Sequence, residues 1–168
     1  MDYMVIISLF IITLPVASII HEWGHFIGAR LLGVQVERVH IGTGAHFFKW
    51  KQGSTEFQYN WNCFLGGYYI LDNEESYPRW KRMIIIFAGS TTSLLVYIIA
   101  FLVDYFFITV NGTFWGNWFY IFMVVNAYMG VIQLFPFRKD VSLKEAGHPS
   151  DGLNLTRLIV NKKGGGNK

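Results

Sequence analysis

Long uninterrupted apolar runs dominate the chain and predict helices that cross a membrane. The first run, Tyr3–Ile20, contains no charged side chain. As a helix its 18 residues reach about 27 Å, close to the thickness of a bilayer's hydrocarbon core. Similar runs cover Met83–Val103 and Trp118–Phe137. We therefore expect three transmembrane helices, over about residues 3–32, 82–108 and 117–136.

A secretory signal peptide is the alternative interpretation of the first run, because it would also lie at the N-terminus. A signal peptide needs a basic start and a cleavage site of small residues. Here the chain starts Met-Asp-Tyr-Met, without Lys or Arg, and the helical pattern continues into His21 and Glu22. These features favour a membrane span.

The segment between the first two spans, about residues 34–72, has the pattern of a small β-sheet. A hairpin turn is predicted at Gln52-Gly53-Ser54, and Gly66-Gly67-Tyr68 indicates a further extended piece or a tight bend. The glycine-rich tail 164–168 is predicted to be flexible. The pattern thus predicts a predominantly α membrane protein with one core, residues 1–163.

Composition agrees with a membrane protein. Hydrophobic residues make up 52% of the 168 residues and charged residues 15%, against about 25% in an ordinary soluble domain. This composition excludes a disordered chain and a typical solvated globule. The single cysteine, Cys63, excludes a disulfide framework and any multi-cysteine metal site.

The basic residues predict the orientation of the spans. All 14 Lys and Arg lie either between the first and second apolar runs or after the third. Three spans place these two regions on one side, and the positive-inside rule makes that side cytoplasmic, with the N-terminus outside. The net charge of +3 is therefore a signal of topology, and we expect no nucleic-acid partner.

A candidate metal motif, His21-Glu22-Trp23-Gly24-His25, continues the first apolar helix. The four-residue spacing puts both imidazoles on one helical face, where both can bind the same cation. Glu22 is rotated by about 100° from His21, which suits a base for a zinc-bound water rather than a ligand. Three ionisable groups at the end of a span are costly unless they are paired, hydrated or metal-bound. The alternative is that the span stops at Ile20 and these residues are interfacial.

A catalytic zinc needs a third protein ligand and an open position for water. Several residues on the same side of the membrane supply an imidazole or a carboxylate. The candidates are His40, His46, Asp72, Asp140, His148 and Asp151.

An ordered set of motifs resembles the site-2 protease family of intramembrane zinc metalloproteases. The resemblance runs from about residue 15 to 158. It is carried by His21–His25, Gly33-Val34-Gln35-Val36, Ile41-Gly42-Thr43-Gly44, Leu65-Gly66-Gly67-Tyr68, Ala88-Gly89 with Ser93, Gln133-Leu134-Phe135-Pro136, and Ser150-Asp151-Gly152.

The resemblance implies roles for individual residues. It makes Asp151, which begins a short C-terminal helix, the third zinc ligand, with Asp140 as the rival. The family usually carries Asn where this chain has Ser93 and Gln133, and those Asn side chains are thought to hold the substrate or polarise its carbonyl. Both replacements keep hydrogen-bonding capacity but change its reach. Gly66 and Gly67 permit close approach of a substrate strand, or form a structural turn.

The sequence therefore predicts a zinc metalloendopeptidase that hydrolyses a peptide bond in or near a transmembrane segment. Zn²⁺ is expected on His21, His25 and Asp151, with Glu22 as the base. The expected substrate is a single-span membrane protein or a peptide precursor, and the expected location is a bacterial cytoplasmic membrane, with the site toward the cytoplasm. The oligomeric state stays open. Two alternatives are a catalytically silent homologue that binds membrane peptides and a metal-handling membrane protein.

Overall fold

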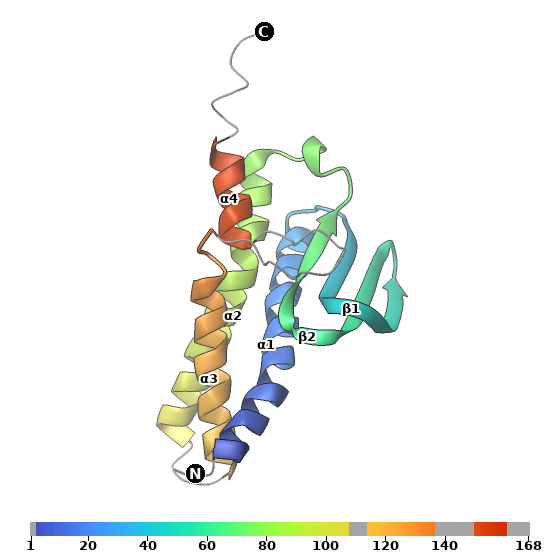
Figure 1. Ribbon diagram of the computed structural model, residues 1–168. Coiled ribbons are helices and arrows are strands. Elements are labelled where there is room, and N and C mark those ends of the chain that lie inside the picture. Colours follow the sequence, from blue (N-terminus) through green and yellow to red (C-terminus); the bar gives the residue numbers. More distant parts are fainter. Residues whose placement is uncertain (1–2, 108–113, 137–149, 161–168) are drawn as a thin grey trace.

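The structure, a computed structural model, describes residues 3–107, 114–136 and 150–160. Within these residues it contains four α-helices, two long β-strands and one short 3-10 helix (Figure 1). In chain order they are α1 (Tyr3–Leu31), β1 (Val36–Gln52), β2 (Thr55–Leu71), η1 (Glu74–Ser76), α2 (Arg79–Phe107), α3 (Phe114–Ile132) and α4 (Asp151–Val160).

Two helices, α1 and Arg79–Phe106 of α2, are long and apolar enough to cross a membrane by length and composition. Only 22% and 33% of their most apolar stretches are buried within the protein. The core helix of a soluble protein would be mostly buried, so this exposure favours contact with lipid. The expected spans 3–32 and 82–108 match these helices to within three residues.

The third predicted span corresponds to α3, which ends four residues earlier than expected. Beyond Ile132 the chain tightens into turns, with backbone hydrogen bonds from Leu134 to Val131 and from Phe135 to Ile132. Pro136 lacks a backbone N–H and disfavours helical geometry in the residue before it, which explains the early end.

Small residues bring α1 and α2 close together. A Cβ atom added to Gly24 would lie 2.6 Å from Oγ1 of Thr92, and one added to Gly28 would lie 2.6 Å from Cβ of Ala88. Side chains at these positions would therefore overlap with α2. The close contact fixes the position of α1 along the axis of α2, and with it which α2 residues face His21 and His25.

The two strands, which lie between α1 and α2 in the sequence, form one small sheet, as expected. They join at a tight turn in which Gly53 has a φ of 62°, so the predicted hairpin turn is confirmed. Both strands bend, and β1 pairs with two stretches of β2. Residues Val36–Ile41 pair antiparallel with Gly67–Leu71. In the pairs from Arg38↔Glu56 to Ile41↔Tyr59 the residue numbers increase in the same direction on both strands, as in a parallel pairing, which makes the sheet mixed.

The sheet packs on the C-terminal half of α1 (Figure 1). Phe57 is completely buried, and its ring stacks against Trp23 of α1 at 5.6 Å and against Trp50 at 4.5 Å. Burial of a side chain of this size contributes about 1.5–3 kcal/mol. The cluster that joins sheet and helices consists of Phe26, Ala29, Val34, Val36, Val39, Ile41, Phe57, Leu71 and Ile85.

Helix α4 lies at the same end of the bundle as the sheet, next to the first turns of α2 (Figure 1). The N-terminus of α1 lies at the opposite end. The C-terminal half of α1 therefore has the sheet on one side and the start of α4 on another. The predicted tail, residues 164–168, lies outside the described residues.

Candidate metal centre

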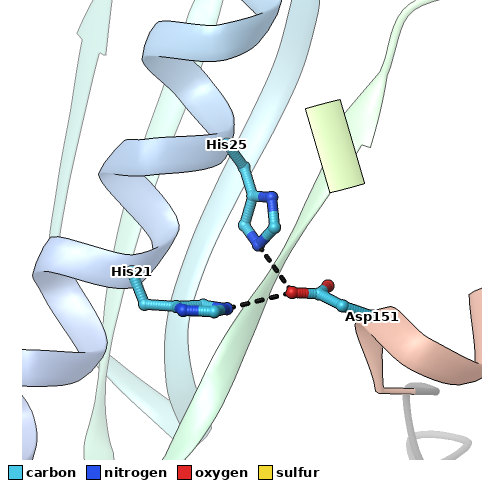
Figure 2. Close-up of side chains that lie close together, drawn as sticks. All are labelled: His21, His25 and Asp151. Carbon is cyan, nitrogen blue, oxygen red and sulfur yellow. Dashed lines mark hydrogen bonds and ion pairs between the residues drawn. The ribbon is translucent and has the colours of Figure 1, made fainter. Parts of the chain in front are cut away.

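His21, His25 and Asp151 meet at one point, although α1 and α4 lie far apart in the sequence (Figure 2). One potential ligand atom from each residue lies within 4.8 Å of the others. The Oδ2 atom of Asp151 is 3.0 Å from Nε2 of His21 and 3.1 Å from Nε2 of His25. Among the described residues this is the group of His, Cys, Asp or Glu side chains that fits a metal ion.

The donor set fits zinc. Two imidazole nitrogens and a carboxylate oxygen are ligands that Zn²⁺ prefers, and three protein ligands leave a fourth position for water. On a tetrahedral ion with bonds of ~2.0–2.1 Å, two ligand atoms are about 3.4 Å apart. The observed 3.0 and 3.1 Å differ from that value by only a few tenths of an ångström.

The second nitrogen of each imidazole is held by α2. Nδ1 of His25 donates a hydrogen bond of 2.7 Å to the carbonyl oxygen of Ile85. Nδ1 of His21 lies 3.1 Å from Oγ of Ser93, within hydrogen-bonding distance. Histidines that bind metal usually bond their other ring nitrogen in this way, which fixes the ring orientation. Both Nε2 atoms therefore face Asp151.

Asp151 is positioned by the start of α4 and the end of α3. Ser150 caps α4, because its Oγ accepts the N–H of Leu153 at 3.2 Å. The same hydroxyl donates to the carbonyl of Phe135 at 2.7 Å, and the N–H of Gly152 donates to the carbonyl of Gln133 at 2.8 Å. Hydrogen bonds on both sides of Asp151 thus tie α4 to the turn that follows α3.

The carboxyl of Asp151 is strongly acidic. Burial acts to raise its pKa, but the positive charge of His25 and hydrogen bonds from both histidines outweigh burial and hold the pKa well below its usual value. The carboxylate is therefore ionised at neutral pH, which is the form that binds a cation.

Glu22 is 3% exposed and lies against strand β2. A Cβ atom added to Gly67 would lie 2.7 Å from Cγ of Glu22 and would also overlap with the carbonyl oxygen of His40. Glycine at position 67 therefore lets the strand approach the carboxyl group. Gly66 belongs to the same strand.

Tyr69, which was not among the expected site residues, covers His25. The two rings lie 4.6 Å apart at an interplanar angle of 33°. Burial, together with the negative charges of Asp151 and Glu22, raises the pKa of the Tyr69 phenol well above its usual value. Tyr69 is two residues after Gly67, and the period of two along a strand places both on the face toward α1. The two-residue spacing from Gly67 was thus the signal in the sequence that could have identified Tyr69 as a site residue.

The remaining expected residues lie in different places. Gln133 is buried, its Oε1 has no hydrogen-bond partner within the described parts of the chain, and its backbone carbonyl holds Gly152. His40, His46 and Asp72 do not join the three-residue group. Two other candidates, Asp140 and His148, lie outside the described residues.

Comparisons with known proteins identify relatives. The sequence profile of peptidase family M50 matches residues 9–151. Three similar proteins bear the name "Putative zinc metalloprotease". The relative in Neisseria meningitidis is 33% identical over 111 residues (55% of this chain, 24% of the relative), and that in Thermotoga maritima 34% over 113 residues (58% and 22%). The relative in Vibrio cholerae is 34% identical over 107 residues (55% of this chain, 24% of the relative). The matches thus cover only about a quarter of these relatives' length.

Proposed function

The chain belongs to peptidase family M50, the site-2 protease family, and from that premise we propose that it is a zinc metalloprotease that hydrolyses a peptide bond in or near a membrane-spanning segment. The family resemblance expected from the motifs is thereby confirmed. Activity, substrate and partners are proposals, because the matches cover only about a quarter of the curated relatives.

The convergence of His21, His25 and Asp151 carries the proposal. Two of these residues follow from a motif four residues apart, whereas the third comes from 130 residues further along the chain. Their side chains are nearly excluded from solvent, with exposed fractions of 2%, 1% and 11%. A buried group of two imidazoles and a carboxylate is costly unless it is paired or holds a cation.

The three residues would hold Zn²⁺, which when bound supplies Lewis-acid activation of water and of the scissile carbonyl. Glu22, adjacent to His21, would accept the proton of the attacking water and deliver it to the leaving amine. Its burial against β2 keeps bulk water away from the carboxyl group. Gln133, with a buried amide oxygen that lacks a hydrogen-bond partner in the described residues, would orient the substrate through its amide.

The exposed apolar faces of α1 and α2, together with the family, indicate an integral membrane protein. We extend this to three spans in one core, residues 1–163. The support is that α3 has 19 residues, about 28 Å, with no charged side chain, and packs alongside α1 and α2 (Figure 1). The positive-inside rule then orients the site toward the cytoplasm and the N-terminus outward, in a bacterial cytoplasmic membrane.

The proposed substrate is a single-span membrane protein or a peptide precursor. A transmembrane helix shields its own carbonyls, so it must unwind locally before water can attack. The stretch Gly67–Leu71 pairs antiparallel with Val36–Ile41 of β1, and Gly67 lies against the side chain of Glu22. An extended peptide that adds alongside this stretch would lie next to Glu22.

The test compares the full-length protein in lipid nanodiscs with its Glu22→Gln variant. Both proteins should bind one zinc ion per chain. Wild type should cleave a peptide that contains a helix-breaking membrane segment, and Glu22→Gln should lower kcat by about 10²–10⁴-fold because it removes the general base. Glu37→Gln, at an exposed residue whose carboxylate lies 3.9 Å from Arg38, is the matched control and should cleave normally.

Two outcomes would contradict the proposal. Zinc bound without cleavage by wild type, with Glu22→Gln making no difference, would indicate a silent homologue that binds peptides. Zinc flux into proteoliposomes without cleavage would indicate a metal-handling protein.

A further inference from the structure

The side chain of Ser93 is turned toward a candidate metal ligand. Ser93 is 0% exposed, and its Oγ lies 3.1 Å from Nδ1 of His21. The opposite nitrogen of that ring, Nε2, is 3.0 Å from Asp151. The hydroxyl therefore contacts the imidazole on the side opposite the candidate metal site, where it can fix the orientation of the ring.

The packing of α1 against α2 determines this contact. The two helices run antiparallel, and His21 lies opposite Ser93 while His25 lies opposite Gly89, one turn earlier in α2. A Cβ atom at Gly89 would overlap with the imidazole of His25. The α2 positions that face the two histidines thus share their four-residue spacing, and each carries a small residue that fits the ring.

The two histidines differ in what holds their Nδ1 atoms. For His25 the acceptor is the backbone carbonyl of Ile85, which is present whatever the side chain. For His21 it is a hydroxyl that only some residues supply. An imidazole that binds a cation through Nε2 carries its proton on Nδ1, and that proton needs an acceptor when it is buried.

We infer that Ser93 is a positioning residue that orients His21 for the metal by accepting the Nδ1–H of its ring, and that it is not a substrate contact. The inference rests on the zinc site of the proposed function. It accounts for serine at a position where the family resemblance led us to expect a contact with the substrate.

Zinc affinity tests the inference, measured on full-length protein in nanodiscs by competition with a chromogenic chelator. Ser93→Ala should weaken zinc binding by about 10–100-fold, the usual effect of losing an outer hydrogen-bond partner of a metal ligand. It should also change the absorption spectrum of the cobalt-substituted protein, since the ligand ring is freed to rotate. Ser93→Thr, which keeps a hydroxyl, should restore zinc affinity.

Ser90→Ala is the matched control. Ser90 lies one turn before Ser93 in α2 and is equally buried at 1% exposure, but its Oγ has no hydrogen-bond partner among the described residues. Ser90→Ala should leave both zinc affinity and the cobalt spectrum unchanged. The thermal unfolding midpoint of the zinc-free protein, measured for all variants, separates ligand orientation from general packing.

Two results would overturn the inference: zinc affinity of Ser93→Ala equal to wild type, or equal losses of zinc affinity in Ser93→Ala and Ser90→Ala. A raised KM for peptide together with the first result would mark Ser93 as a substrate contact. Failure of the proposed function is distinguishable, because a wild-type protein that binds zinc but does not cleave leaves the comparison of zinc affinities intact. A wild-type protein that binds no zinc would contradict both the proposed function and the inference about Ser93.

Discussion

The candidate metal centre has two parts that are built differently. The first part, His21 and His25 on α1 with their α2 partners, lies within two packed helices. The second part, Asp151, comes from α4, a helix of 10 residues held by hydrogen bonds to the turn after α3. The two imidazoles of the first part are four residues apart on one helix, whereas the carboxylate of the second part reaches them only through docking of a distant chain segment.

The difference shows that the ligands of one site can be positioned by different means. Helix geometry fixes the spacing of the two imidazoles, and the close packing at Gly24 and Gly28 sets where α2 meets them. The carboxylate needs only a few hydrogen bonds at a helix start, because both histidines also attract it. Changes that disturb the packing of α1 against α2 should therefore affect folding and zinc together, and changes around Asp151 should affect chiefly zinc.

The largest expected effect comes from removing the carboxylate. Asp151→Ala should lose more zinc affinity than the ~10–100-fold that accompanies loss of an outer-shell partner, because it removes a ligand itself. Peptide cleavage should vanish with the zinc. Chelator competition measures the affinity, and Asp72→Ala, at an acidic residue outside the metal group, is the control.

Retention of zinc by Asp151→Ala would contradict the division of the site into two parts, since Asp151 would then not be a ligand. Asp140→Ala would show in that case whether the rival carboxylate binds instead. With Asp151 as the ligand, Asp140→Ala should bind zinc like wild type.

A substitution in the first part should reduce stability as well as zinc affinity. Gly28→Leu forces a side chain into the space that Cβ of Ala88 occupies, and overpacking of this kind costs about 1–3 kcal/mol. We expect a lower thermal unfolding midpoint and weaker zinc binding, because separation of the helices draws His21 and His25 away from their α2 partners.

Ile27→Leu supplies the control for the same helix, since Ile27 is 47% exposed and its volume is conserved. It should unfold at the wild-type temperature. Equal stability of Gly28→Leu and Ile27→Leu would show that α1 and α2 do not need close contact.

The smallest effect is expected at the cap of α4. Ser150→Ala removes the N-cap acceptor of Leu153 and the bond to Phe135, and loss of an N-cap typically costs about 1 kcal/mol. Zinc affinity should fall modestly because α4 loosens, without loss of the fold. Thr156→Ala, at an exposed residue whose hydroxyl donates to the carbonyl of Gly152 in the same helix, should change zinc affinity less. The reverse order would show that the cap does not position Asp151.

Local patterns in the sequence were sufficient for much of the fold. Uninterrupted apolar runs located the two helices that can cross a membrane, and Gln52-Gly53-Ser54 located the hairpin turn. The end of α3 was predicted less well, because the apolar run continues to residue 137 although the helix ends at Ile132 and the chain turns ahead of Pro136. The spacing of His21 and His25 predicted a shared face because a helix repeats every 3.6 residues.

Only the tertiary structure decided which distant groups meet these histidines. Six residues could have supplied the third ligand by residue type, and packing of α4 against α2 and the turn after α3 brings Asp151 to that place. The carbonyl of Ile85 carries no signal in the sequence, since every residue has one. Ser93 was expected at the substrate, and the packing of α1 against α2 places its Oγ 3.1 Å from Nδ1 of His21, the contact from which we infer a positioning role. Sequence sets what each segment can form, whereas contacts between segments depend on how closely their surfaces fit.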